Sequence, residues 1–263
     1  MDPVAFSFGS LSIHWYGVCM AAAVLLGMWT ASRRGMREKI HPDTVYDMSP
    51  WIIIGAIVGA RLLFVVTYWD QKFAGKPFMD IFAIRTGFVY YGGFIAASAS
   101  VIWFCRRRKL PIWKIGDVLA PSVALGHALG RIGCLFTGCC YGKECTLPWA
   151  FEYPAIYEHL HGRAIHPTQI YESLLNFALY GGLVWLYRRK KFDGQVFATY
   201  LVAYAIIRSF VEMYRGDYKD HQIVGFLTPG QLVSVLIVTA GIVLFLKLPR
   251  RIAPAHPETE AAK

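Results

Sequence analysis

Ionisable side chains interrupt several apolar stretches of this chain, and they are the residues best placed to carry chemistry. Arg61, Arg131 and Arg208 each lie inside such a stretch, and so do Glu172 and Glu212. Charged groups in a membrane-like segment are costly unless they are paired or face a cavity. Three guanidinium groups against two carboxylates leave a surplus of positive charge, and guanidinium groups bind phosphate oxygens through paired hydrogen bonds. The pattern predicts an anion site, and at membrane depth the natural anion is a lipid phosphate.

The same charges also have a purely structural interpretation. Arg208 and Glu212 are four residues apart, the spacing that brings two side chains together on one helix face. Tyr204 precedes Arg208 by four residues, as His127 precedes Arg131, so each helix presents its polar side chains on one face. An isolated tyrosine or histidine could equally anchor a helix at the membrane interface. Spacing alone leaves both interpretations open.

Other kinds of chemistry are not indicated by the sequence. No group of carboxylates that would hold Mg²⁺ lies in an apolar stretch, and Asp217 and Asp220 are typical of a solvated turn beside Arg215 and Lys219. A glycine-rich phosphate loop, a dinucleotide-binding fingerprint and a nucleophilic serine motif are all missing from the sequence. We therefore expect no metal and no cofactor, and we expect arginine to provide the electrostatic stabilisation.

Transmembrane helices are the elements expected to position these residues. Of the 263 residues 56% are apolar and only 17% are charged, while the 15% aromatic content excludes a disordered chain. Apolar windows close to the ~20 residues that cross a bilayer core recur along the chain. Because the arginines follow the first window and do not precede it, we expect this window to be a transmembrane helix and not a signal peptide. We predict an all-α integral membrane protein, a single domain over 1–263, with spans at 15–30, 50–68, 86–105, 112–132, 167–187, 194–214 and 228–246.

The distribution of basic residues predicts the orientation of this seven-helix bundle. Clusters of Lys and Arg follow the first, third, fifth and seventh spans and contain 15 of the 27 basic residues. By the positive-inside rule the N-terminus lies outside and the C-terminus in the cytoplasm, with Arg107 and Lys190 inside and Gly142 and Tyr218 outside. The polar residues of six spans then share the outer leaflet, next to a small periplasmic segment at 133–166. Because these clusters account for the net charge of +10, we expect no nucleic-acid partner.

Several motifs give the chain a resemblance to a known family. Their residues are His14-Trp15-Tyr16-Gly17, Tyr91-Gly92-Gly93, Gly130-Arg131-Ile132-Gly133-Cys134-Leu135-Phe136-Thr137-Gly138-Cys139-Cys140-Tyr141-Gly142, His166-Pro167-Thr168-Gln169-Ile170-Tyr171-Glu172, and Tyr204 with Arg208, Glu212 and Arg215. In this order, and across essentially the whole chain, they resemble the bacterial prolipoprotein diacylglyceryl transferases. The glycine-arginine signature and the His-Pro-Thr-Gln segment are highly specific.

The resemblance implies a multi-pass enzyme of the bacterial inner membrane with its active site toward the periplasmic leaflet. Such an enzyme transfers the diacylglyceryl group of phosphatidylglycerol to the lipobox cysteine thiol in a prolipoprotein signal peptide. A thioether forms and glycerol 1-phosphate leaves, which is the first step of lipoprotein maturation. The implied partners are phosphatidylglycerol, prolipoprotein signal peptides and membrane lipids.

Motif positions also imply roles for individual residues. Arg131 would hold the phosphatidylglycerol headgroup, Arg208 would stabilise phosphate charge, and Tyr16 and Tyr204 would make essential polar contacts. The remaining residues expected to bind substrate are Arg61, Gly142, Gln169, Glu172 and Glu212.

The chain departs from the family pattern at the proposed base. Tyr91 stands where the family often has a histidine, and an unperturbed tyrosine, with a pKa of about 10, is a poor base at neutral pH. His166 is therefore our second candidate for a catalytic residue that accepts the thiol proton, because histidine titrates near neutrality. His166 could equally serve only to cap the helix that starts at Pro167.

A second departure replaces polar residues of the signature with cysteines and a threonine. Cys134, Thr137 and Cys139 stand where two asparagines and an acidic residue are expected, so polar contacts to the lipid must differ in detail. With Cys140 and Cys145, four of the six cysteines fall within twelve residues. In an oxidising outer compartment we expect disulfides, of which a Cys139–Cys140 bond is sterically the least favourable. We favour disulfides over zinc because the spacing does not match the usual zinc motifs.

Two other classes of function also use buried arginines. One is a transporter or flippase for an anionic lipid or metabolite, although such folds commonly show inverted repeats and helices broken near mid-membrane. The other is a substrate-binding receptor. Only the enzyme would make a thioether product from labelled phosphatidylglycerol and a lipobox peptide.

Overall fold

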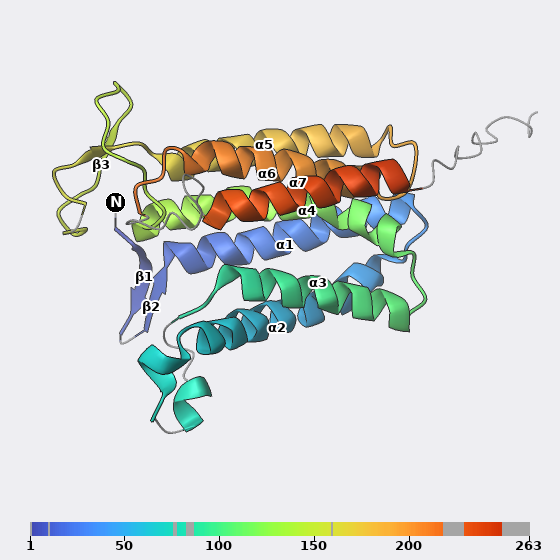
Figure 1. Ribbon diagram of the computed structural model, residues 1–263, viewed down its shortest axis with the longest axis horizontal. Helices are drawn as coiled ribbons and strands as arrows, with labels where there is room; N and C mark the ends of the chain where they lie inside the picture. The colour runs from blue at the N-terminus through green and yellow to red at the C-terminus, as the bar shows by residue number, and fades with distance from the viewer. Residues whose placement is uncertain are drawn as a thin grey trace, which may run out of the picture. The chain divides into compact units, whose positions relative to one another are not determined.

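A computed structural model describes residues 2–9, 11–75, 78–82, 87–158, 160–217 and 229–248. Most of these residues lie in seven helices, α1 (Trp15–Arg37), α2 (Pro42–Thr67), α3 (Tyr90–Arg107), α4 (Ile112–Thr137), α5 (Thr168–Tyr187), α6 (Gln195–Glu212) and α7 (Pro229–Lys247) (Figure 1). Each helix falls on one of the apolar spans, so the expectation of a mainly helical chain is confirmed. Tyr218, Lys219 and Asp220 lie outside the described residues, as do position 86, where the third predicted span begins, and position 228, where the last one begins.

The helices differ from the predicted spans mainly at their ends. α1 continues to Arg37, which with Arg34 places positive charge at the negative end of the helix dipole. α2 begins earlier than predicted, at Pro42, because proline is well suited to the first helical position. By length and composition, four described helices could cross a membrane: α1, α2, α4 and the part of α7 from Gly230 to Lys247.

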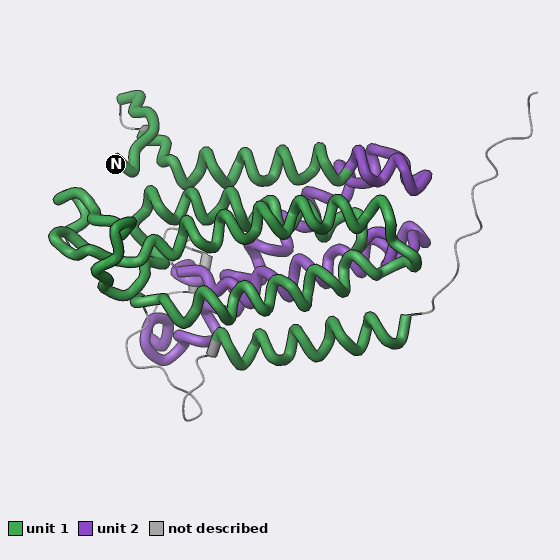
Figure 2. Tube along the Cα trace, turned by 90° about the horizontal axis from the view of Figure 1, so that it is seen from above, with its two compact units in different colours: residues 1–31, 116–263 green, residues 32–115 purple. Residues whose placement is uncertain are grey.

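The chain forms two compact units, which are coloured separately in Figure 2: residues 1–31 with 116–263, and residues 32–115. We call them unit 1 and unit 2. Unit 2 contains α2 and α3, which pack against each other. A Cβ atom on either Gly59 or Gly92 would collide with the backbone carbonyl oxygen of the other residue. The two backbones are therefore in direct contact, a close approach that only glycine allows.

In unit 1, α4 is the helix that joins its neighbours (Figures 1 and 2). Toward α1, the Ser122 hydroxyl donates to the carbonyl oxygen of Gly27 at 2.6 Å and lies 3.0 Å from the Thr30 hydroxyl. Toward α5, the Ser173 hydroxyl donates to the carbonyl oxygen of Ala128 at 2.9 Å. α6 packs between α5 and α7. Buried hydroxyl groups thus hydrogen-bond across the helices, which fixes their register as well as their contact.

Asp117 of α4 caps the start of α6. Its carboxylate accepts hydrogen bonds from the backbone N–H groups of Gly194 at 2.9 Å and Phe197 at 3.0 Å, and lies 3.1 Å from Lys190 Nζ. Gly194, the N-cap residue of α6, has φ +93° and no side chain that could accept these bonds. A carboxylate from another helix therefore satisfies N–H groups that the first helical turn leaves without partners.

Short strands, which the apolar pattern did not predict, accompany the helices. β1 (Val4–Phe8) and β2 (Leu11–His14) form an antiparallel hairpin, and β3 (Phe151–Glu152) pairs with β4 (Ala164–Ile165). Unit 2 adds a π-helical turn, η1 (Trp69–Phe73), and a 3₁₀ turn, η2 (Phe78–Phe82). The hairpin and the β3 loop lie at the same end of the unit 1 helices (Figure 1). Trp15 stacks on Phe136 there, with ring centroids 5.4 Å apart, so α1 begins where α4 ends.

Replacing Asp117 with alanine should lower the free energy of unfolding by about 3 kcal/mol, because it removes the cap of α6 and one buried partner of Lys190. The measurement is thermal unfolding of the purified protein in detergent. Asp193→Asn is the matched control, because Asp193 also lies 3.1 Å from Lys190 Nζ but its side chain is 48% exposed, against 0% for Asp117. Equal losses of stability in the two variants would contradict the capping role.

Candidate active site

Two ion pairs form the centre of the polar site in unit 1. Arg131 Nη2 of α4 lies 2.9 Å from Glu172 Oε1 of α5, and Arg208 Nη2 of α6 lies 2.6 Å from Glu212 Oε2 one turn along the same helix. The carboxylate side chains are 3% and 1% exposed, whereas the arginine side chains are 19% and 13% exposed. The carboxylates are therefore enclosed by protein, and the arginine is the more exposed side chain of each pair.

His127 and Tyr204 connect the two ion pairs. The ring of His127 on α4 lies against that of Tyr204 on α6, with centroids 4.6 Å apart, and Tyr204 stacks on Tyr200 at 5.7 Å. The positive charges of Arg131 and Arg208 both act on His127. The two arginines, which come from different helices, are thus within electrostatic range of one imidazole. The spacing of His127 from Arg131 indicated a shared polar face, and the structure places the His127 ring beside Tyr204.

Tyr16 extends the site toward α1. Its side chain is partly exposed and lies within electrostatic range of Arg131 and of the thiol of Cys134. A Cβ atom on Gly133 would lie 3.0 Å from Tyr16 Cδ2, so the glycine lets α4 approach the first turn of α1. Tyr16, Tyr204, the two arginines and the two glutamates therefore all lie in unit 1.

Gly142 lies in an extended segment between two other stretches of chain. Its N–H donates to the His166 carbonyl oxygen at 3.1 Å, and the Lys143 N–H donates to the Tyr214 carbonyl oxygen at 2.8 Å. The His166 N–H in turn donates to the Lys143 carbonyl oxygen at 2.9 Å. A Cβ atom at position 142 would lie only 2.5 Å from the His166 oxygen. Packing thus requires glycine here, and binding of substrate through Gly142 stays a prediction.

The first turn of α5 holds the chain that follows Arg131. The Thr168 hydroxyl donates to the carbonyl oxygen of Cys140 at 2.8 Å, and Gln169 Nε2 donates to the carbonyl oxygen of Cys139 at 2.7 Å. Gln169 Nε2 also lies 3.0 Å from the Tyr153 hydroxyl, which accepts its second hydrogen bond. The contacts of Gln169 are therefore with the protein itself, and a contact with substrate stays a prediction.

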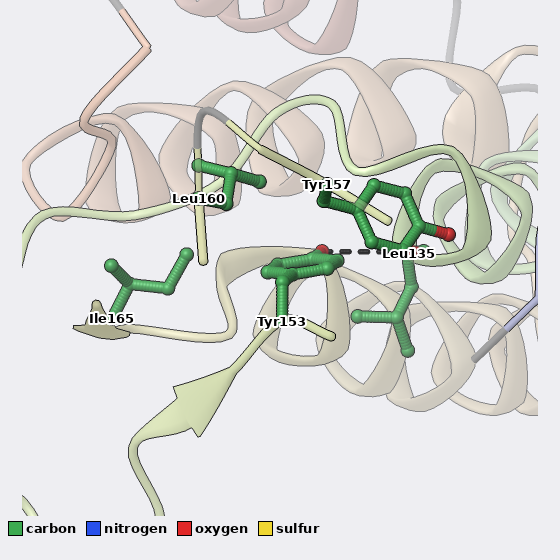
Figure 3. Packing of buried hydrophobic residues seen from close by; sticks show 5 residues of the cluster. All are labelled: Leu135, Tyr153, Tyr157, Leu160 and Ile165. Atoms are coloured by element: carbon green, nitrogen blue, oxygen red, sulfur yellow. Dashed lines mark hydrogen bonds between the residues drawn. The ribbon is translucent and has the colours of Figure 1, made fainter. Parts of the chain in front are cut away.

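A small hydrophobic cluster, formed by the loop between α4 and α5 and the end of α4, supports the same segment (Figure 3). It consists of Leu135, Tyr153, Tyr157, Leu160 and Ile165, all buried. The Tyr153 hydroxyl donates to the Leu135 carbonyl oxygen at 3.3 Å, the dashed line of Figure 3. Burial raises the pKa of Tyr153 above its ordinary value, so the phenol stays protonated and keeps this donor at physiological pH. The loop is thereby tied to the end of α4.

His166 lies beside the extended segment among aromatic rings. Its Nδ1 is 3.3 Å from the Tyr171 hydroxyl, and its ring is 5.2 Å from that of Tyr214 between centroids. The N-cap residue of α5 is Pro167, and no side chain caps this helix. The interpretation of the His166 side chain as a helix cap is therefore wrong, because the imidazole turns toward Tyr171 instead.

Arg61 and Tyr91, by contrast, belong to unit 2. The Arg61 guanidinium donates to the carbonyl oxygens of Ile81 and Asp80, each at 2.9 Å, and of Gly87 at 3.2 Å. It thereby holds a loop of unit 2, and a role in substrate binding stays a prediction. Tyr91 lies in the first turn of α3 and is 38% exposed. The other nine expected site residues all lie in unit 1.

Comparison with known proteins identifies the family. The family model described as prolipoprotein diacylglyceryl transferase matches residues 3–247. The chain belongs to this family. Relatives named phosphatidylglycerol–prolipoprotein diacylglyceryl transferase occur in Finegoldia magna (37% identical over 254 residues, 96% of this chain and 98% of the relative) and in Synechococcus elongatus (37% over 250 residues, 91% and 85%). A third, from Clostridium tetani, is 33% identical over 248 residues, 93% and 97% of the two chains. The resemblance drawn from the motifs is confirmed.

In this member of the family the cysteines are not joined by disulfides. All six lie in the described part of the chain, and all six are free thiols. The Sγ atoms of Cys134, Cys139 and Cys140 lie within 4.8 Å of one another, whereas Cys145 lies outside this group and pairs its N–H with the Ala164 carbonyl oxygen at 2.9 Å. The expectation of two disulfides among these four residues is therefore wrong for this structure, because the backbone gathers three thiols rather than two pairs.

The close packing at Gly142 predicts the effect of a single added methyl group. Gly142→Ala should lower the free energy of unfolding by about 1–3 kcal/mol, because the new Cβ must displace the backbone of residue 166. Gly181→Ala is the control, since a Cβ there meets no atom within 4 Å and alanine favours the helix. Thermal unfolding in detergent compares the two. Equal stability of both variants would contradict the prediction, because it would mean that the backbone around residue 142 shifts at little cost in free energy.

Proposed function

We propose that this chain is a phosphatidylglycerol–prolipoprotein diacylglyceryl transferase of the bacterial inner membrane. Its substrates are phosphatidylglycerol and the lipobox cysteine of a prolipoprotein, and its reaction begins lipoprotein maturation. Membership of the family supports this function, as do the names of the relatives. The observation that carries it is the pair of arginines, Arg131 and Arg208, that two enclosed carboxylates hold within reach of one imidazole, since guanidinium groups bind phosphate oxygens through charge-assisted hydrogen bonds.

We further propose that all seven helices cross the membrane, with the N-terminus outside and residues 133–166 in the periplasm. The helical bounds support this topology, because Arg37, Arg107 and Lys247 each lie in the last turn of a helix that would end in the cytoplasm. The opposite ends of the unit 1 helices carry Tyr16, Arg131 and the extended segment around Gly142. The active site would then face the outer leaflet, where both substrates are within reach.

Charge changes during the reaction assign the arginines a direct role. The thiolate sulfur attacks the glyceryl carbon that bears the phosphate, the carbon–oxygen bond breaks, and its electron pair stays on the leaving phosphate oxygen. The phosphate group thereby changes from a singly charged diester to a monoester that can carry two negative charges. Arg131 and Arg208 bind the group more strongly as this charge grows, which lowers the barrier. Glu172 and Glu212 hold the two guanidinium groups in position before the lipid arrives.

Lysine should not replace either arginine. Arg131→Lys and Arg208→Lys should each lower turnover about 10²-fold or more, because lysine keeps the charge but loses the paired donors. The assay follows thioether formation between labelled phosphatidylglycerol and a lipobox peptide. Arg163→Lys is the control, since the Arg163 side chain is 58% exposed on the outer loop. Near-normal turnover of a folded Arg131→Lys or Arg208→Lys enzyme would contradict the assignment, as would binding of lipid without any thioether product.

We propose that His166 accepts the thiol proton. An imidazole can accept a proton only while it is neutral, so we expect the rate to fall in acid. His166→Gln should lower the rate and remove this acidic fall, while Tyr91→Phe should preserve it. Rate profiles against pH on folded variants test this. A His166→Gln enzyme with the parental rate and profile, beside an inactive Tyr91→Phe enzyme, would return the role to Tyr91.

A further inference from the structure

Three cysteine side chains converge at the end of α4, although they come from a helix and a turn. Cys134 lies in the last turn of α4, and the chain then reverses through Gly138, with φ +70°, and Cys140, with φ +61°. A left-handed conformation is uncommon for a cysteine. It brings the side chains of two consecutive residues, Cys139 and Cys140, to the same side of the chain, where both face Cys134. All three Sγ atoms lie within 4.8 Å of one another.

One hydrogen bond within the turn and two from α5 hold this turn in place. The Cys139 N–H donates to the Cys134 carbonyl oxygen at 3.3 Å. Thr168 and Gln169 of α5 bind the carbonyl oxygens of Cys140 and Cys139, at 2.8 and 2.7 Å. The three thiols are therefore preorganised by backbone contacts and do not depend on a bond between sulfur atoms. Preorganisation of this kind is what a metal site requires of its ligands.

A positive charge lies beside the three sulfur atoms. Arg131 Nη1 lies 4.0 Å from Cys134 Sγ. Three thiolates around a divalent cation carry one net negative charge, which a guanidinium group at this distance can offset. Three thiolates around a monovalent cation would carry two net negative charges.

We propose that Cys134, Cys139 and Cys140 together bind one Zn²⁺ ion through their sulfur atoms. Each thiol loses its proton to solvent when it ligates the ion. Tetrahedral zinc with Zn–S bonds of about 2.3 Å sets its sulfur atoms about 3.8 Å apart. The thiols, within 4.8 Å of one another, need to close by no more than about 1 Å, which side-chain rotation can supply. A disulfide would use only two of the three sulfur atoms.

Three protein ligands leave the fourth position of the ion open, as in zinc sites that act on substrates. A thiol that ligates zinc is deprotonated outright. In this chain the open position would hold the lipobox cysteine as a thiolate beside Arg131, and the thiol proton would pass to His166, the acceptor proposed above. This use of the ion rests on the proposed transferase function, whereas binding of the ion does not.

The test is metal binding by the full-length protein, purified in detergent under reducing conditions and freed of metal. Co²⁺ serves as the spectroscopic probe of a zinc site. We expect one equivalent to produce sulfur-to-cobalt charge-transfer absorption, and Zn²⁺ to abolish it by displacement. Cys134→Ser and Cys140→Ser should each weaken Zn²⁺ binding at least about 10²-fold, since loss of even a supporting residue costs up to that much. Cys145→Ser is the matched control from the same segment and should bind as the parent does.

Three results would overturn the site: no charge-transfer band in the folded parent protein, equal binding by folded Cys140→Ser, or a disulfide within the trio that persists under the reducing conditions, seen by mass spectrometry. The thioether assay on the same preparations separates this inference from the proposed function. An active parent enzyme that binds no metal contradicts the zinc site alone. A parent protein that binds one Zn²⁺ but forms no thioether contradicts the transferase function and leaves the site standing.

Discussion

Two buried carboxylates determine much of the arrangement of unit 1. Glu172 and Glu212 are almost fully enclosed, and an enclosed carboxylate without a partner costs about 3–5 kcal/mol, which is a large part of the stability of a domain. Arg131 must therefore approach α5, and Arg208 must fold along its own helix. A Cβ atom on Gly230 would lie 2.7 Å from Glu212 Oε1, so the start of α7 also fits around this carboxylate. The guanidinium groups that satisfy this constraint are the ones that we propose bind the lipid phosphate.

The segment that follows Arg131 is held by the same helix that provides Glu172. It turns back at Gly138, runs through the close contact of Gly142 with His166, and is bound by the first turn of α5, which also carries Glu172. One helix thus supplies both the carboxylate that holds Arg131 and the hydrogen bonds that hold the cysteines. Stability and chemistry share these contacts, so a change in the turn is expected to alter both.

How far the sequence predicts this structure depends on the range of each interaction. The helices follow from apolar length, which is local, and the Arg208–Glu212 pair follows from its spacing on one helix face. Arg131 and Glu172 lie on different helices, so their residue types predict a polar site but not this pair. The hydrogen bonds from Arg61 to backbone carbonyl oxygens could not be predicted either, because their partners are 19 to 26 residues away in the sequence. The cysteines were misjudged because the compartment favours disulfides, whereas the left-handed turn at Cys140 depends on Thr168 and Gln169 of α5.

The central claim is that Arg131 serves the lipid as well as its carboxylate partner, and exchange of the two charges tests it most directly. The double variant Arg131→Glu with Glu172→Arg keeps an ion pair between α4 and α5 but moves the positive charge onto the other helix. We expect it to unfold at a higher temperature than either single variant, because the pair is restored, and to form no detectable thioether, because the guanidinium no longer faces the phosphate. A double variant with near-parental transferase activity would contradict the account and leave the pair with a structural role only.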